Sequence, residues 1–323
     1  MITRRAALAG LAAVPIAEAA AQQPPFPSKP LTLVVPFPPG GPADIFGRFL
    51  AEGMAEDLGK SVIVENKSGV AGVSGMDVVA KAGTDAHVMG MMSSSAGAIM
   101  PTLMPNMPYD ALRDLAPVIL VTRVQEVLVV SAKLGVSDFK SLIARLKAEP
   151  GKYSYGSAGT GGITHLAMEL FKRETGTDTV HVPYRGAAPA VNDLLAGQVQ
   201  MAILDVPVVL PHIRSGAFTA IAVTSDVGAP LLPGVPTMRD LGYPSVNSDN
   251  WYGLASPHAA PSAQLGRVHD AAAKALKSKK LADAYAAVGG IVVGGSADEF
   301  AQFQRQEIQK WAGVIKLANI KFE

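Results

Sequence analysis

Apolar residues along the chain follow two patterns that alternate many times. Short unbroken runs, such as 31–35 and 199–205, are typical of strands buried on both faces. The longer segments between them place apolar residues at helical spacing, as Ile45, Phe49 and Met54 do in 43–58. This alternation predicts an α/β fold with mostly parallel sheets flanked by helices.

The same patterns predict the order of the elements. Strands are expected at 31–35, 61–69 (with its exit turn), 87–94, 124–132, 153–157, 178–184, 199–205 and 218–225, and a further apolar segment lies at 251–257. Helices are expected at 43–58, 72–83, 137–150, 162–176, 187–198, 208–216, 261–289 and 296–319. No fixed-period repeat is present, which argues against a repeat protein.

The first 21 residues have a different character. Arg4 and Arg5 precede an apolar stretch, 6–17, and small residues follow at Ala17, Ala19 and Ala21. A basic start, a short apolar core and an Ala-x-Ala site indicate a secretory signal peptide, and the paired arginines suggest the twin-arginine route. We expect cleavage after Ala19 or Ala21 and export of the remainder. A membrane anchor would need a longer apolar stretch.

Composition narrows the class of protein. The chain has 323 residues, 49% of them hydrophobic, which is enough for one large domain or two medium ones. It carries 28 basic and 27 acidic residues, and removal of residues 1–21 takes away two arginines and one glutamate. A neutral mature chain has no basic stripe for nucleic acid. The absence of cysteine excludes disulfides, thiolate metal sites and cysteine nucleophiles.

A proline- and glycine-rich loop, 36–44, joins the first strand to the first helix. The start of a helix exposes unpaired backbone N–H groups and the positive end of the helix dipole, which together favour an anion. Gly40 and Gly41 allow the backbone to approach a ligand closely, and Pro42 suits the first helical turn. Asp44 would repel an anion, so we expect it to pair with Arg48 four residues on.

A second loop, within 153–165, repeats the order of strand, glycine-rich loop and helix. It adds the hydroxyl groups of Ser157 and Thr160. Both loops follow the carboxyl ends of strands, where open α/β sheets bind their ligands. One such loop is as consistent with tight strand-to-helix packing as with binding. Two of them in separate halves of the chain favour an anion-binding cleft.

No complete catalytic or cofactor motif is present. Neither loop has the spacing of a phosphate-binding P-loop, a dinucleotide fingerprint or a nucleophile elbow, and no two histidines have metal-ligand spacing. His165 opens a helix and is interpreted as a packing or capping residue. A methionine-rich segment, 89–107, could bind Cu(I), but we interpret it as core. We expect no cofactor and no metal ion.

Five segments of the chain occur together in a fixed order: PSKPLTLVVPFPPGGPAD, YGSAGTGGITHLAMELF, VHVPYRGAAPAVNDLLAGQVQMAILD, AVTSDVGAPLLPGVPTMRDLGYP and WYGLASP. In this order they resemble the solute receptors of tripartite tricarboxylate transporters, the TctC or Bug family. The resemblance covers about 27–320. It implies a two-domain periplasmic-binding-protein fold of the type II kind, with domain 1 formed by 27–123 plus 251–323 and domain 2 by 124–250.

The resemblance also implies which residues bind the ligand. In the family, two strand-to-helix loops hold a ligand carboxylate through backbone N–H groups, hydroxyls and water, and an acidic residue, here Asp205, lies near the distal end. Asp205 could equally cap its strand or form an interdomain contact. The expected ligand-binding residues are Phe37, Gly40, Gly41, Pro42, Ala43, Asp44, Ser94, Ser157, Ala158, Gly159, Thr160, Gly161, Gly162 and Asp205.

The chain departs from the family pattern at several of these positions. Pro42 and Ala43 stand where Ser and Thr are frequent, Gly162 stands where Ser is frequent, and Leu204 stands where Phe is frequent. Fewer hydroxyl donors predict a less polar cleft, so we expect a carboxylate ligand with an apolar or aromatic body rather than citrate. Arg185 could reach a second carboxylate or remain solvated.

The resemblance implies a periplasmic receptor, not an enzyme, that is a monomer and closes by a hinge around a small carboxylate. It would deliver that ligand to a two-subunit membrane permease. One alternative is a sensor that docks on the outer domain of a two-component histidine kinase. Another is an exported hydrolase that uses Asp44, His165 or Asp205, although no spacing forces any two of these together.

Overall fold

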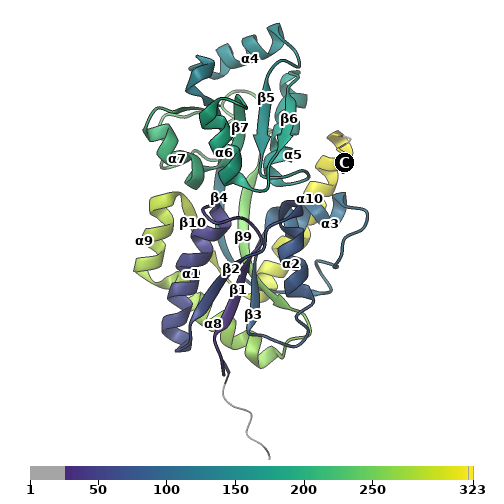
Figure 1. Ribbon diagram of the computed structural model, residues 1–323, viewed down its shortest axis with the longest axis vertical. Coiled ribbons are helices and arrows are strands. Elements are labelled where there is room, and N and C mark those ends of the chain that lie inside the picture. Colours follow the sequence, from purple (N-terminus) through teal and green to yellow (C-terminus); the bar gives the residue numbers. More distant parts are fainter. Residues whose placement is uncertain (1–25, 319, 323) are drawn as a thin grey trace, which may run out of the picture.

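The computed structural model describes residues 26–318 and 320–322. The predicted signal peptide, 1–21, lies outside the described residues. Two lobes are stacked along the long axis of the molecule (Figure 1). The strands are β1 (Leu31–Val35), β2 (Val62–Asn66), β3 (Val88–Ser93), β4 (Leu115–Ser131), β5 (Ser154–Ser157), β6 (Val180–Pro183), β7 (Met201–Asp205), β8 (Phe218–Val223), β9 (Asp249–Pro257) and β10 (Gly290–Gly294).

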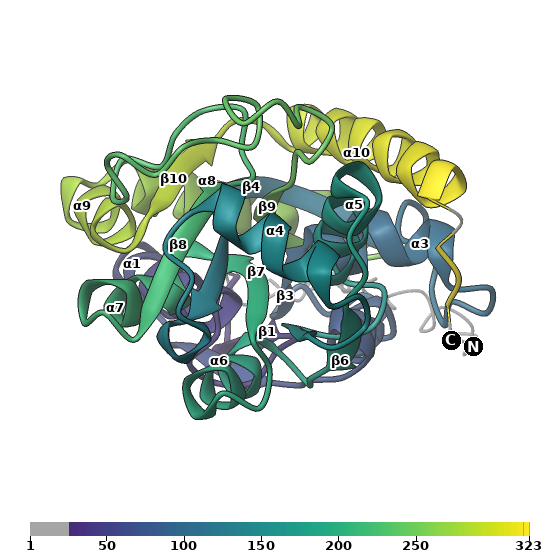
Figure 2. The ribbon, with the colours of Figure 1, turned by 90° about the horizontal axis from the view of Figure 1, so that it is seen from above.

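The long helices flank these strands (Figure 2). They are α1 (Pro42–Leu58), α2 (Val73–Ala80), α4 (Phe139–Ala148), α5 (Ile163–Thr175), α6 (Ala187–Ala196), α7 (Val206–Arg214), α8 (Ser262–Lys277), α9 (Lys279–Val288) and α10 (Ala297–Ala318). Short helical turns are η1 (Val70–Gly72), η2 (Ser95–Ile99), α3 (Met100–Leu103) and η3 (Ala132–Leu134). No helix in the described ranges has the length and hydropathy to cross a membrane.

The lower lobe, as drawn in Figure 1, contains β1–β3, β9, β10, α1–α3 and α8–α10. The upper lobe contains β5–β7 and α4–α7, and β8 joins it by pairing with the same part of β4 as β7 does. Strand pairing runs in the order β2-β1-β3-β9-β4-β7-β5-β6, so β4 and β9 link the two lobes. The predicted parallel pairing holds for β1 with β2 and β3, and for β5 with β6 and β7. The pairs that involve β4 or β9 are antiparallel.

Strand β4 changes partners where it passes from one lobe to the other. Gln125 is opposite Asp249 of β9, and the next residue, Glu126, is opposite Asp205 of β7. Arg123 is opposite Trp251, the pair at which the sequence predicts the chain to cross between domains. The domain boundaries stay a prediction, but this change of partners lies beside them.

Apolar packing holds each lobe together and also joins them. In the lower lobe one core lies under α1, α8 and α9, and a second lies under α2 and α10. The second core also takes in Ile163, Leu166 and Leu170 of α5, which belongs to the upper lobe. Met89, Met91, Met92 and Met100 are fully buried, in line with the interpretation of the methionine-rich segment as core.

Sequence patterns miss four features of the fold. The segment 261–289, predicted as one helix, is divided at Ser278, whose extended backbone (φ −70°, ψ 135°) ends α8 and whose hydroxyl accepts from the N–H of Leu281 to cap α9. Strand β10 and the turns over 95–103 were not expected. Strand β4 begins nine residues before the predicted 124, because its first half pairs with β9.

Gly253 of β9 gives a test of the packing under α10. A Cβ atom at Gly253 would lie 2.1 Å from Cζ of the buried Phe300. We expect Gly253→Ala to lower the free energy of unfolding in urea by roughly 1–3 kcal/mol, because the ring has to move. Gly266, exposed on α8 with no neighbour near its Cβ position, is the matched control. Gly266→Ala should instead raise stability by about 0.5–1 kcal/mol; equal effects at the two sites would contradict this account.

Candidate ligand-binding site

The two glycine-rich loops have the same backbone conformation. Gly41 precedes α1 with φ −79° and ψ 168°, and Gly162 precedes α5 with φ −77° and ψ 167°. In each case the glycine carbonyl accepts two N–H groups at 3.0 Å, from the residues three and four positions on. The segments 38–44 and 159–165 therefore form two copies of one structural unit, one in each lobe.

Each unit has a glycine with left-handed backbone, fastened by a side chain four residues on. Gly40 (φ 79°) donates its N–H to Oδ2 of Asp44 at 3.0 Å, and Gly161 (φ 74°) donates to Nδ1 of His165 at 3.1 Å. Such a backbone favours glycine, which has no Cβ. Asp44 and His165 are thus equivalent residues, and each holds its loop against the first turn of its helix.

Asp44 is further fixed by Arg48, whose guanidinium lies 2.8 Å from its carboxylate, so the predicted pair is confirmed. Asn66 of β2 donates to the Asp44 carboxylate at 3.0 Å and to the carbonyl of Phe37 at 2.9 Å. Burial acts to raise the pKa of Asp44, but the hydrogen bonds from Arg48, Gly40 and Asn66 outweigh it and lower the pKa. The first loop is therefore tied to a carboxylate that stays ionised.

The fastened loops leave one amide of each helix available. Within the described part of the chain, the N–H groups of Ala43 and Thr164, each at the second position of its helix, make no hydrogen bond. The N–H groups at the start of a helix point along its axis and carry the positive end of the dipole. These two amides are suited to an anion placed between them.

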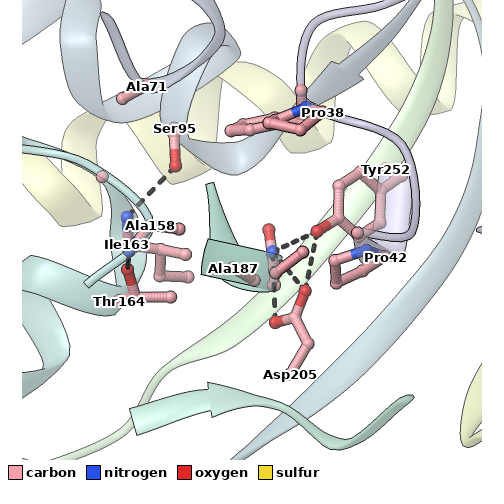
Figure 3. A pocket seen from close by; sticks show the side chains of 15 residues that line it. Pro38, Pro42, Ala71, Ser95, Ala158, Ile163, Thr164, Ala187, Asp205 and Tyr252 are labelled. Atoms are coloured by element: carbon pink, nitrogen blue, oxygen red, sulfur yellow. Dashed lines mark hydrogen bonds between the residues drawn. The ribbon is translucent and has the colours of Figure 1, made fainter. Parts of the chain in front are cut away.

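A cavity lies between the two helix starts (Figure 3). Its volume is about 30 Å³, room for one or two water molecules, so an organic ligand would need the lobes to move apart. It is lined by Phe37, Pro38, Gly41, Pro42, Ala71, Ser95, Ala158, Gly162, Ile163, Thr164, Ala187, Ala188, Asp205, Asn250 and Tyr252. Most of these side chains are apolar, and no lysine or arginine is among them.

The first helical position differs between the units. Pro42 has no N–H, whereas Ile163 donates its N–H to the Ser95 hydroxyl at 3.1 Å. Ser95 belongs to the lower lobe and Ile163 to the upper lobe, so this bond crosses between them (Figure 3). It holds the start of α5 beside the cavity.

Asp205 closes the end of the cavity away from α5 (Figure 3). Its carboxyl oxygens accept from Nδ2 of Asn250 at 2.9 Å and from the Tyr252 hydroxyl at 2.7 Å, and only 3% of the residue is exposed. Burial raises the pKa of Asp205 to about 7; the bonds from Tyr252 and Asn250 act in the opposite direction, and Asp249 adds to the rise.

Two further carboxyl groups lie near Asp205, at the change of partners in β4. Glu126 is fully buried and its carboxyl oxygens have no partner among the described residues. Burial, and then the neighbouring Asp205, raise the pKa of Glu126 well above its usual range. Asp249 pairs with Arg123 at 2.9 Å. At this end of the cavity Asp205 and Glu126 therefore hold their protons more strongly than ordinary carboxyl groups do, and no lysine or arginine lines the wall.

The structure brings six of the predicted binding residues to the cavity wall: Phe37, Gly41, Pro42, Ala158, Gly162 and Asp205. Gly40, Ala43, Asp44, Gly159 and Gly161 build the two loops, and Thr160 lines a neighbouring hollow with Arg185. The Ser94 hydroxyl donates to Oδ1 of Asn250 at 2.6 Å, and that of Ser157 contacts Nε2 of His181 at 2.7 Å. Neither serine lines the cavity, so both act behind its wall.

Several lining residues escape sequence reasoning. Asn250 and Tyr252 lie on β9, far from either loop in sequence. The π-helical turn over Ser95–Ile99 is likewise predicted by no pattern. One local signal was available: both loops read Gly-Gly-x-x followed by a polar side chain, Asp44 or His165. Aligning the loops on this spacing would have indicated the shared fastening role.

A model of the tripartite tricarboxylate transporter family receptor matches residues 46–320. The chain belongs to this family. Protein BugT of Bordetella pertussis is 39% identical to this receptor over 299 residues, an alignment that covers 92% of each chain.

Solved structures agree with the family assignment. An R. palustris protein with adipate is 31% identical, with a TM-score of 0.89 over 92% of this receptor and 99% of that chain. MatC from Rhodopseudomonas palustris with bound malate is 27% identical, with a TM-score of 0.86 over 90% of this receptor and all of that chain. The predicted periplasmic-binding-protein fold and the role as a solute receptor of a tripartite transporter are confirmed.

The raised pKa of Asp205 gives a test with a defined sign. The folded receptor holds a proton on Asp205 that the unfolded chain, with its ordinary pKa, releases near pH 4, so this residue's contribution to stability falls as the pH rises from about 4 to about 7. We expect the free energy of unfolding of Asp205→Asn, relative to the parent, to rise by on the order of 2–4 kcal/mol between pH 4.5 and pH 8 in urea titrations.

Asp298, exposed on α10, gives the control for this comparison. For Asp298→Asn the same difference should be constant with pH. A constant difference for Asp205→Asn as well would mean that Asp205 is ionised in the folded protein over the whole range.

Proposed function

We propose that this receptor binds a small monocarboxylate with an apolar or aromatic body, in the cavity between the starts of α1 and α5. The observation that carries the proposal is the pair of unbonded amides, Ala43 and Thr164, in two copies of one loop structure. Each copy presents the positive end of a helix dipole to the same space. Bound adipate and malate in two related structures support carboxylates as the ligand class.

The lining of the cavity supports a single acid group. Phe37, Pro38, Ala71, Ala187 and Ala188 offer apolar contacts to the body of a ligand. At the far end, no lysine or arginine lines the wall, so a second carboxylate would meet no positive charge there, and above the pKa of Asp205, about 7, it would also be repelled by that residue. A hydroxyl or another hydrogen-bond donor would be accepted there.

The loops and the cavity wall together define the residues of the proposed site. The amides of the segments 37–44 and 157–164 face or support the ligand carboxylate, while Asp205, Asn250 and Tyr252 bound its other end. Hinge closure about β4 and β9, the two strands that join the lobes, would capture the ligand. The closed form would then be read by a two-subunit permease in the membrane, and no bond of the ligand is made or broken.

The proposed location is the periplasm. The support is the family of transporter receptors to which the chain belongs and the secretory signal predicted within residues 1–21. A small anion that enters the periplasm would meet the receptor there before it reaches the permease.

A ligand panel tests the class of ligand. Benzoate, adipate, malate and citrate would be titrated into the mature protein by calorimetry at one pH. We expect benzoate to bind at least about tenfold more tightly than citrate, because the cavity has apolar walls and carboxyl groups at its end. Tight citrate binding with no binding of benzoate would overturn the proposed ligand class.

Gly41 tests the role of the first helix start. It has ordinary backbone angles, and a Cβ there would meet only the Pro38 carbonyl, at 3.5 Å. We expect Gly41→Val to fold with a thermal midpoint within a few degrees of the parent, and to lose about tenfold or more in affinity for the tightest acid of the panel. Gly161→Val is a poorer test, because its side chain would collide with Leu103 and Met100 at 2.8 Å.

Gly228, exposed and away from the cavity, supplies the control for Gly41. Gly228→Val should leave affinity unchanged. If folded Gly41→Val also binds as the parent does, the ligand does not use the start of α1.

A further inference from the structure

A stack of aromatic side chains lies under the second loop. The imidazole rings of His165 on α5 and His181 on β6 have centroids 4.0 Å apart and planes only 8° apart. The ring of Tyr155 on β5 stacks on His181 at 4.9 Å. His165 is 8% exposed, so the stack is largely shielded from water.

Each imidazole holds part of the loop. Nδ1 of His165 accepts the N–H of Gly161 at 3.1 Å. Nε2 of His181 lies 2.7 Å from the Ser157 hydroxyl oxygen, which accepts the N–H of Gly159 at 3.3 Å. The Ser157 hydroxyl can donate its hydrogen to Nε2 while its oxygen accepts from Gly159. With this tautomer of His181 both rings serve as acceptors, which requires that both are neutral.

A proton on either ring changes this arrangement. Protonated Nδ1 of His165 would be a donor facing the N–H of Gly161, so that bond would be lost. Protonated Nε2 of His181 would turn the Ser157 hydroxyl hydrogen away. A second proton would also place two positive charges 4.0 Å apart.

Burial of the stack opposes protonation of His181. Glu169 on α5 attracts a proton to the stack, but it is already bonded to the Tyr155 hydroxyl at 2.6 Å and to Lys172 at 2.9 Å. Burial, and then the neighbouring His165, lower the pKa of His181 to about 4, with Lys172 acting in the same direction and Glu169 against it. Neutral His181 is thus the stable form near neutral pH.

The first loop lacks this sensitivity. At the position equivalent to His165 it has Asp44, whose carboxylate is held ionised by Arg48 and Asn66. Acidification from pH 7 to pH 5 would leave that fastening unchanged while it acts on the second loop. The two halves of the site therefore differ in their response to pH.

We propose that His165 and His181 are positioning residues of the second loop, and that the loop keeps its anion-binding shape only while both imidazoles are neutral. The inference rests on the proposed function only in treating this loop as half of the ligand site. In an acidified medium the receptor would then bind its carboxylate less tightly. The loss of affinity would come from the upper lobe alone.

Amide signals of the ligand-free protein test this directly. The mature chain, labelled with ¹⁵N-glycine, would be followed by NMR from pH 7.5 to pH 4. We expect the amide signals of Gly159 and Gly161 to shift as the imidazoles take up protons, while that of Gly40 stays constant. Gly159 and Gly161 signals that stay constant over this range would overturn the proposal.

Substitution of His165 separates positioning from general packing. In His165→Ala, the Gly161 amide should exchange with solvent about tenfold faster at neutral pH, because its acceptor is gone. Asn at this position offers an oxygen that accepts the same N–H and has no proton to gain, so His165→Asn should restore protection and remove the pH-dependent shift of Gly161. A shift in His165→Asn equal to that of the parent would overturn the proposal.

A histidine elsewhere in the chain provides the control. His258 is exposed on the lower lobe, and His258→Asn should leave the behaviour of Gly159 and Gly161 unchanged. Because no ligand is added, these outcomes do not depend on whether the receptor binds a carboxylate. The affinity of the parent for the tightest acid of the panel, measured at pH 7.5 and pH 5, then reports the consequence for binding separately.

Discussion

The site depends on backbone N–H groups that two helix starts leave without partners. A shielded amide without a partner costs about 1–3 kcal/mol, so a lobe that carries one gains stability when an anion satisfies it. Here two such amides, Ala43 and Thr164, belong to different lobes; Thr164 lines the cavity, and Ala43 follows Pro42, which also lines it. In the proposed function an anion would satisfy both amides at once, which would couple ligand binding to the approach of the lobes. No formal positive charge is needed in the wall.

The amides can serve an anion only if the loops before them are rigid. Each loop has a glycine with left-handed backbone, and the N–H of that glycine is taken up by a side chain of the first helical turn. In each helix the amide at the second position, that of Ala43 or Thr164, then has no hydrogen-bond partner among the described residues. The same geometry is achieved with different chemistry, a carboxylate in Asp44 and an imidazole in His165, which places different constraints on the two lobes.

The link between the lobes is polar as well as apolar. Strand β4 changes partners at Glu126, next to Asp205, and both carboxyl groups are buried there. Their raised pKa values mean that ionisation at this point is costly. Asp205, which bounds the cavity, ends β7 directly opposite Glu126 of β4. The bond from Ile163 to Ser95 and the packing of Leu166 into the lower core hold α5 against the lower lobe.

The sequence by itself determined the elements, the α/β class, the two glycine loops and the pairing of Asp44 with Arg48, because each depends on neighbours within a few residues. It did not determine the division at Ser278 or strand β10, where local preference was weak. Only the tertiary structure decided that Asn250 and Tyr252 bound the cavity and that His165 stacks on His181. These contacts join residues that are far apart in the chain, and no local pattern records which distant strand will pack beside which loop.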